Sequence, residues 1–236
     1  MSRPSRGCDG TARRRRGQQV VAVLKALVTG FDPFGGDKVN PSSLAVGQLK
    51  KRIGEVVVHT AQLPTSYAHS ASVLRAAIEE VKPELVLCVG QAGGRTELSL
   101  ERVAINVQDA RIRDNDGKQP IDKPVVKDGP AAHFATLPIK ACVAEMRKAG
   151  LPAAVSNTAG TFVCNHIFYA LMDIAQSHPI PIRGGFLHIP YVPEQAARLG
   201  GAPSMALDDI VRGIEIILEV SASRVSDVHT IEGRIS

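Results

Sequence analysis

From Val20 onward, short apolar runs alternate with amphipathic stretches, and this alternation restricts the possible folds more than any other feature of the chain. Apolar runs of four to eight residues between turn residues are typical of buried strands, whereas apolar residues spaced three or four apart are typical of helices. The clearest pair is the amphipathic stretch 66–82, ended by Pro83, and the wholly apolar run 85–89. The pattern predicts a single α/β domain with three layers, α/β/α, and a largely parallel twisted sheet.

The remaining predicted strands and helices alternate in the same way, without an internal repeat or a linker. Strands are expected at 26–29, 55–60, 85–89, 153–156 and 185–189. Helices are expected from the cap Asn40-Pro-Ser-Ser43 and over 66–82, 137–149, 162–177 and 205–220. Only the polar, turn-rich stretch 101–134 departs from this order. Long connections of this kind are usually functional or disordered, and we expect this one to overhang the site or to make an oligomer contact.

The net charge of +5 belongs to the N-terminus and not to the body of the chain. Residues 1–19 carry six arginines against one aspartate, which accounts for the whole net charge. A body without net charge argues against nucleic-acid binding. We therefore expect a basic, disordered tail over 1–19, the domain over 20–224, and a C-terminal tail over 225–236.

Two further patterns bear on cellular location. No run of eighteen apolar residues is present, so no membrane-spanning helix is expected. Arg13 to Arg16 precede an apolar run, as in an export leader, but Lys25 splits that run and no cleavage site follows. The four cysteines lack disulfide or metal-ligand spacing. We expect a cytoplasmic protein with reduced thiols and without a metal or other cofactor.

Glycine-rich segments with distinctive side chains follow the expected strands. In an open α/β sheet, ligands bind beyond the carboxyl ends of the strands. The segments are Thr29-Gly-Phe-Asp-Pro-Phe-Gly-Gly36, Gly90-Gln-Ala-Gly-Gly-Arg95, Asn157-Thr-Ala-Gly-Thr-Phe-Val-Cys164 and His188-Ile-Pro-Tyr191. Their convergence predicts an active site at one edge of the sheet.

Cys164 is the candidate nucleophile. It stands at the start of an expected helix, where Thr161 is a possible N-cap, and a helix N-terminus lowers the pKa of a thiol and favours the reactive thiolate. The alternative is a buried structural cysteine, which is chemically inert. For Cys88, in an apolar strand, and for Cys142, on the apolar face of a helix, packing in the core is the expected role.

A thiol nucleophile needs a base within hydrogen-bond reach. His188 closes a strand at the expected site, whereas His166, two residues from Cys164 on the same helix, points elsewhere and is expected to be an exposed or a packed helix residue. An acid would orient the imidazole. Glu101, Asp32 and Asp109 are the acids near strand ends, and spacing alone does not choose between them.

The loop with Phe31 and Phe34 does not fit a phosphate cradle, because it lacks the following Lys-Ser/Thr pair and two large aromatic side chains occupy it. Two of the six phenylalanines of the chain in one glycine-rich loop instead suggest an apolar wall for a ligand. Ordinary packing of the loop against the sheet is the alternative for either ring.

Taken together, these segments resemble the pyrrolidone-carboxylate peptidase (pyroglutamyl-peptidase I) family of cysteine peptidases. The resemblance covers Ala26 to Val220 and runs through the segments at 29–36, 90–95 and 156–165, together with Glu101-Arg-Val-Ala-Ile-Asn106, Gln119-Pro-Ile-Asp122 and Gly185-Phe-Leu-His-Ile-Pro190. It implies a phosphorylase/hydrolase-like α/β domain without a metal, often tetrameric and intracellular, which removes N-terminal pyroglutamyl residues from peptides.

The resemblance also implies roles for individual residues. Cys164 would be the nucleophile, His188 the base and Glu101 the third member of the triad. The substrate pocket would comprise Phe31, Phe34 and Phe162, with Gln91 near the ligand. Two alternatives remain at this point: a nucleoside phosphorylase of similar architecture, and a non-enzymatic binder whose arginine-rich tail contacts nucleic acid or anionic surfaces.

Overall fold

The computed structural model describes residues 23–233, so the tail expected at 1–19 lies outside the described residues. The strands are β1 Leu24–Phe31, β2 Arg52–Ile53, β3 Val56–Leu63, β4 Leu85–Gln91, β5 Leu98–Glu101, β6 Val103–Ile105, β7 Ala132–Phe134, β8 Ala153–Ser156 and β9 Arg183–Ile189. The helices are α1 Pro41–Gly47, α2 Ser70–Val81, α3 Ile139–Lys148, α4 Val163–Ser177, α5 Pro193–Arg198 and α6 Leu207–Ser223. Every strand and helix expected from the sequence is present, with ends that differ by a few residues.

Seven strands form the central sheet in the order β2-β3-β1-β4-β9-β5-β8. The pairs β1–β3, β1–β4, β4–β9 and β5–β8 are parallel, whereas β2–β3 and β5–β9 are antiparallel. The expected largely parallel sheet is confirmed. However, β5 and β8 run opposite to the central strands, so the loop after β8 does not leave by the edge at which β1, β4 and β9 end.

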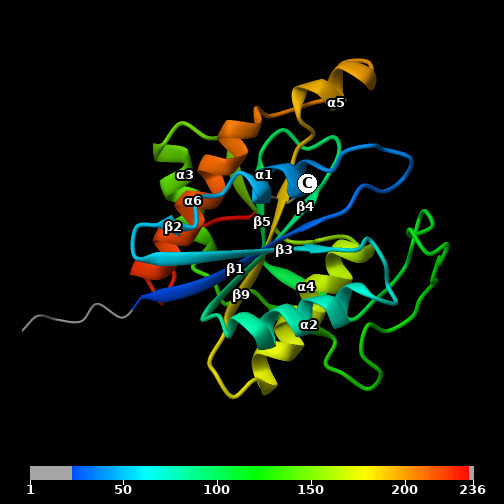
Figure 1. Cartoon of the computed structure of the whole chain (residues 1–236), viewed down its shortest axis with the longest axis horizontal. Coiled ribbons are helices and arrows are strands. Elements are labelled where there is room, and N and C mark those ends of the chain that lie inside the picture. Colours follow the sequence, from blue (N-terminus) through cyan, green and yellow to red (C-terminus); the bar gives the residue numbers. More distant parts are fainter. Residues whose placement is uncertain (1–22, 234–236) are drawn as a thin grey trace, which may run out of the picture.

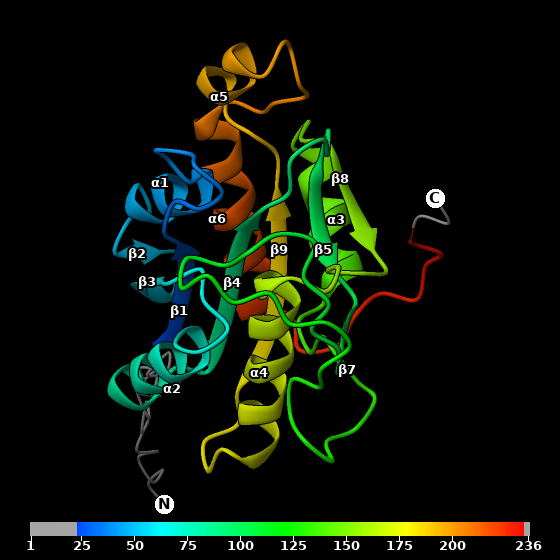
Figure 2. The same cartoon turned by 90° about the vertical axis from the view of Figure 1, so that its right-hand side faces the viewer.

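Helices cover both faces of this sheet, as the predicted three-layer architecture requires. Figure 1 shows α2 and α4 on one side of the sheet, and α1, α3 and α6 on the other. In Figure 2, α4 crosses in front of β4 and β9, while α6 lies behind them. Strand β4 is buried throughout except at its last residue, because helices shield both of its faces.

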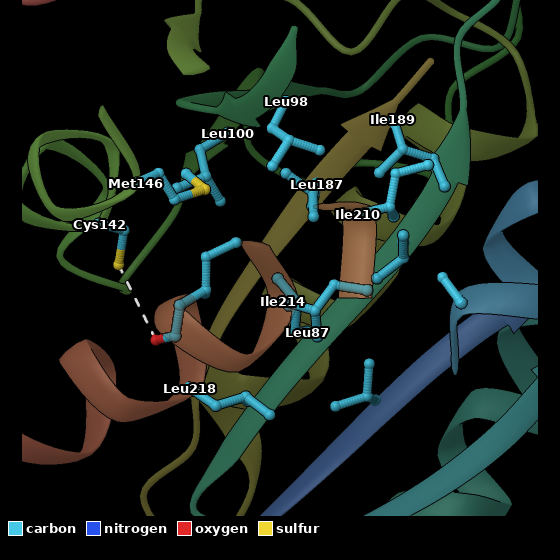
Figure 3. Packing of buried hydrophobic residues seen from close by; sticks show 14 of the residues in the cluster. Leu87, Leu98, Leu100, Cys142, Met146, Leu187, Ile189, Ile210, Ile214 and Leu218 are labelled. Atoms are coloured by element: carbon cyan, nitrogen blue, oxygen red, sulfur yellow. Dashed lines mark hydrogen bonds between the residues drawn. The ribbon is translucent and has the colours of Figure 1, made fainter. Parts of the chain in front are cut away.

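Each face of the sheet packs a separate apolar cluster against its helices. On the side of α3 and α6, leucines of the sheet, among them Leu87 and Leu187, meet Ile214 and Leu218 of α6 (Figure 3). Burying a side chain of this size contributes about 1.5–3 kcal/mol. Cys142 lies in this cluster and Cys88 in the cluster under α2 and α4, so the predicted core role of both cysteines is confirmed.

The first strand and first helix show how the sequence sets the local structure. Asn40 caps α1 by accepting a hydrogen bond from the backbone N–H of Ser42, and Pro41 occupies the first turn. The hydroxyl of Ser42 in turn accepts from the N–H of Phe31. Gly30 permits this approach, because a Cβ atom there would lie 2.7 Å from the backbone of Ser42. The loop after β1 is therefore anchored to α1.

Several short elements were not predicted from the sequence. Strand β5 has four residues, β6 and β7 form a separate antiparallel ribbon, and α5 spans six residues. The C-terminal stretch expected to be a tail lies against the body up to residue 233. There the Asp227 carboxylate accepts from the backbone N–H groups of Lys140 and Ala141, and Glu232 pairs with Arg147 at 2.6 Å.

Within residues 23–233, no helix is long and apolar enough to cross a membrane. The same part of the chain holds no group of three or more His, Cys, Asp and Glu side chains placed to bind a metal ion.

Candidate active site

A cavity of about 630 Å³ lies where β1, β4 and β9 end, beside the first turn of α4. Cys164, His188, Gln91, Phe34 and Phe162 all border it. Five of the seven residues expected to form the site are thus brought to one cavity. Glu101 lies directly behind the histidine, and Phe31 lies elsewhere.

Cys164 stands in the first turn of α4, which begins at Val163 with Phe162 as its N-cap. Thr161, the possible N-cap, does not cap the helix, and its hydroxyl donates instead to the carbonyl of Asp109 at 2.7 Å. A close approach to β4 fixes the position of the thiol. A Cβ atom at Gly90 would lie 2.9 Å from Cys164 Sγ and 2.8 Å from the ring of Phe186, so only glycine fits there.

The pKa of Cys164 moves in the direction opposite to the one that its helix position suggests. Burial, with a smaller contribution from the Glu101 carboxylate, raises the pKa of the thiol to about 12, although the Arg95 guanidinium acts in the opposite direction. Burial is the largest cause, because a thiolate that is removed from water loses its hydration. A thiol whose pKa is raised in this way needs a base to remove its proton as it reacts.

His188 has the partner that a general base needs. Its Nδ1 lies 2.7 Å from Oε1 of Glu101, which is completely buried. The antiparallel pairing of β5 and β9 sets Ser99 opposite His188, so Glu101, two residues further along, shares the same face of the sheet. An ionised carboxylate can only accept, so Nδ1 carries the proton and Nε2 is left as the acceptor.

Arg95 joins this pair from the loop after β4. Its Nη1 donates to the same Oε1 of Glu101 at 2.9 Å, and its Nη2 donates to the carbonyl of Thr158 at 3.3 Å. Oε2 of Glu101 has no partner among the described residues. Glu101 is thus held by two donors on one oxygen. Asp32, which sequence spacing left as an alternative acid, instead accepts from the backbone N–H of Thr65 at 2.7 Å.

The aromatic side chains divide into a wall of the cavity and a support behind it. Phe34 and Phe162 are half-buried, with ring centroids 6.0 Å apart, and Tyr67 meets Phe162 edge-on at 5.7 Å. Phe31 is only 2% exposed and packs against Phe186 in the core, with ring centroids 6.4 Å apart. Of the two rings in the loop, Phe34 borders the cavity and Phe31 packs the loop onto the sheet.

The polar stretch after β6 overhangs the cavity, which is one of the two roles expected for residues 101–134. Asp109, Arg111 and Ile112 border the cavity, and none of them was proposed as a wall from the sequence. The stretch is firmly attached at its tip: Asp114 accepts from the backbone N–H of Tyr67 at 2.9 Å, and Asn115 donates to the carbonyl of Pro33 at 2.9 Å. These contacts join segments far apart in the sequence.

His166 faces away from the thiol. It is 5% exposed, its Nδ1 lies 3.1 Å from Nε2 of Gln108, and it borders a different cavity between α2 and α4. Burial lowers its pKa to about 4. Of the two roles expected for this histidine, exposed or packed, the structure shows the packed one.

Comparisons with known proteins agree with this geometry. The model of the pyroglutamyl peptidase family matches residues 24–224. A pyrrolidone-carboxylate peptidase of Bacillus thuringiensis (strain Al Hakam) is 52% identical over 208 residues, which are 88% of this chain and 97% of that protein.

Solved structures show the same similarity in three dimensions. The crystal structure of Bacillus amyloliquefaciens pyroglutamyl peptidase I superposes with a TM-score of 0.85 at 50% identity, covering 87% of this chain and 100% of that one. Pyrrolidone carboxyl peptidase from Thermococcus litoralis gives a TM-score of 0.84 at 37% identity, covering 88% of this chain and 99% of that one.

Proposed function

The chain belongs to the pyroglutamyl peptidase family, and on that premise we propose which of its residues carry out the reaction. It is a cysteine peptidase that removes N-terminal pyroglutamyl residues. In our proposal Cys164 is the nucleophile, His188 the general base and Glu101 the group that orients the base. The observation that carries this assignment is the hydrogen bond between His188 and Glu101 at the wall of the cavity that Cys164 borders.

Acylation begins with the neutral thiol. Nε2 of His188 takes the proton of Cys164 as Sγ attacks the carbonyl carbon of the pyroglutamyl residue, and a tetrahedral oxyanion forms. The imidazolium then gives this proton to the departing amine, the C–N bond breaks, and a thioester remains on Cys164. Glu101 holds the tautomer of His188 and offsets its positive charge, while Arg95 fixes the position of the Glu101 carboxylate.

Water completes the cycle. It attacks the thioester with His188 as base, the S–C bond breaks, and pyroglutamate leaves as the thiol is restored. The backbone N–H groups of the first turn of α4 lack carbonyl partners within the helix, so they are available to the oxyanion in both steps. A donor of this kind contributes about 2.7–4 kcal/mol to the stability of the transition state.

The proposed substrate pocket suits a flat, neutral ring. Phe34 and Phe162 supply the apolar walls, and Gln91 supplies a polar group for the edge of the lactam. Phe31 supports this pocket from the core, where it fixes the loop that presents Phe34. Arg111 and Ile112 stand at the overhanging side, where the rest of the peptide leaves the cavity.

We also propose a cytoplasmic homotetramer that needs no cofactor. Free thiols at Cys88, Cys142 and Cys164 are consistent with a reducing compartment. The exposed side chain of Phe134, at 67%, and that of Ile121, at 65%, offer apolar surface for contacts between copies. Light scattering on the purified protein measures the mass of the assembly, and a monomer would contradict this proposal.

The function is tested by release of a chromogenic amine from its pyroglutamyl derivative. We expect hydrolysis by the native protein, none by Cys164→Ser, and loss of activity with iodoacetamide. The matched prolyl derivative, which lacks the ring carbonyl, serves as the control substrate. Equal hydrolysis of both derivatives, or full activity after alkylation, would contradict the proposal. Phosphate-dependent cleavage of a nucleoside would instead support a phosphorylase.

A further inference from the structure

Gln91 is tied to a second glutamine, which has no part in the mechanism above. Gln195 belongs to the short helix α5 and is 1% exposed. Its Nε2 donates to Oε1 of Gln91 at 3.1 Å. The contact joins the end of β4 to a helix 104 residues further along the chain. A buried amide at this point sets how Gln91 presents itself to the cavity.

The surroundings of Gln195 allow only one orientation of its amide. Nε2 also faces the carbonyl of Val39 at 3.3 Å and Oδ2 of Asp37 at 3.4 Å, while Oε1 accepts from the backbone N–H of Val192 at 3.3 Å. If the amide were turned over, its oxygen would face two acceptors and its NH₂ group would face a donor. The backbone and one carboxylate thus decide which end of Gln195 meets Gln91.

This orientation determines that of Gln91. Because Gln195 presents a donor, Gln91 turns its Oε1 toward it, and the Nε2 of Gln91 has no acceptor within residues 23–233. Gln91 is half-buried and borders the cavity of Cys164. A free amide donor at that wall complements a ring carbonyl oxygen, whereas the opposite orientation would place two oxygens against each other.

We propose that Gln195 is a positioning residue that selects pyroglutamyl substrates by orienting the Gln91 amide with its NH₂ group toward the lactam carbonyl. This inference rests on the proposed function. A site built to hydrogen-bond a polar group of its substrate rejects analogues without it, because its own donor then remains unpaired. Gln195 therefore affects recognition of the ring and leaves the transfer of protons between Cys164 and His188 unchanged.

The test compares Gln195→Met and Gln195→Glu in the full-length enzyme, with a pyroglutamyl amide of a chromogenic amine as substrate. Methionine keeps the size of the side chain and removes the donor, so we expect KM to rise about ten-fold, the effect of one hydrogen bond, with kcat little changed. Glutamate offers only acceptors and draws the Gln91 NH₂ group toward itself, so we expect a larger rise in KM.

A double-mutant cycle separates positioning from a general structural effect. In the Gln91→Ala background, Gln195→Met should change KM by less than about two-fold, because its effect passes through the Gln91 amide. Gln176→Met is the matched control: Gln176 Nε2 lies 3.0 Å from Nδ1 of His133, outside the walls of this cavity, and we expect native KM.

The outcomes distinguish this inference from the proposed function. A native enzyme that fails to hydrolyse the pyroglutamyl amide would refute the function itself. If the native enzyme is active, an unchanged KM in Gln195→Glu, or an equal loss in the presence and absence of the Gln91 side chain, would refute positioning by Gln195. Should Gln195→Met fail to fold, the KM of Gln195→Glu is compared with and without the Gln91 side chain instead, because glutamate keeps the size of the side chain.

Discussion

Phe31, the last residue of β1, and Phe34, in the loop that follows, lie three residues apart, yet the structure predicts opposite effects for their replacement by alanine. Phe31 is 2% exposed and packs against Phe186. Removing a buried phenylalanine side chain destabilises a domain by about 3–5 kcal/mol. For a domain of this size, 1 kcal/mol shifts Tm by about 2–4 °C, so Phe31→Ala should lower Tm by roughly 6–20 °C.

Phe34 borders the cavity and is half-buried, so its removal leaves little empty volume in the core. Phe34→Ala should instead reduce transition-state binding by about 1–3 kcal/mol, or roughly ten- to two-hundred-fold in kcat/KM, with Tm close to native. Alkylation of Cys164 by a small reagent should survive this change, because the thiol and His188 are untouched.

Two measurements on each variant check this contrast. Thermal unfolding reports stability, and kcat/KM for a pyroglutamyl amide is measured well below the lower Tm, so that only folded enzyme contributes. A large loss of kcat/KM in folded Phe31→Ala with native Tm would refute the division between wall and support. So would a Phe34→Ala variant that lost stability and kept its native kcat/KM.

The remaining predictions concern the thiol, its base and one buried histidine. Cys164→Ser should abolish hydrolysis with Tm unchanged, while Cys142→Ser should keep native kcat and lose stability; turnover by Cys164→Ser would contradict the mechanism. His188→Ala should lower kcat by orders of magnitude, whereas His166→Ala should not. Glu101→Gln should lose an intermediate amount of activity, because its amide still positions the imidazole ring. Steady-state kinetics give this ranking, and a larger loss in His166→Ala than in His188→Ala would identify His166 as the base. Burial lowers the pKa of His166 from 6.5 to about 4, so the unfolded state binds a proton below pH 6.5 that the folded state does not bind until about pH 4. His166 should therefore lower the free energy of unfolding by about 2 kcal/mol between pH 7 and pH 5. Urea titrations at the two pH values should show a smaller decrease for His166→Gln than for the native protein. An equal decrease in both proteins would show that His166 is not its cause.

Sequence patterns located most of the sheet because its central strands are buried on both faces. The run 85–89 is apolar throughout, and a run of this kind between turn residues is typical of a strand buried on both faces. Strand β5 was missed because its four residues alternate apolar and polar side chains, over too short a length for a period to be recognised. Its direction depends on pairing with β9, which no local pattern encodes.

Site residues on long segments were easier to locate than those held by tertiary contacts. Cys164 and His188 could be proposed because each ends or begins a recognisable element. The preference for Glu101 over Asp32 came only from the family resemblance, since the register of β5 against β9 decides it. Arg95 stood in a segment that the sequence pointed to, but its bond to Glu101 is made by the fold, and Gln195 had no local signal at all.

The pKa of Cys164 was predicted in the wrong direction for the same reason. A helix N-terminus is visible in the sequence, whereas the depth of burial of the thiol is not. The thiol packs close to Gly90 of β4, a contact between segments far apart in the sequence. The position at a helix start indicates a lowered pKa, whereas burial is the largest cause of the raised pKa.

The most direct test of the central claim is to trap the acyl-enzyme. The native enzyme is mixed with a pyroglutamyl ester, quenched in acid during turnover, and measured by intact-protein and peptide mass spectrometry. We expect the added mass of one pyroglutamyl group, located on the peptide that contains Cys164 and absent from Cys164→Ser. Turnover without this adduct, or an adduct on another residue, would contradict the account.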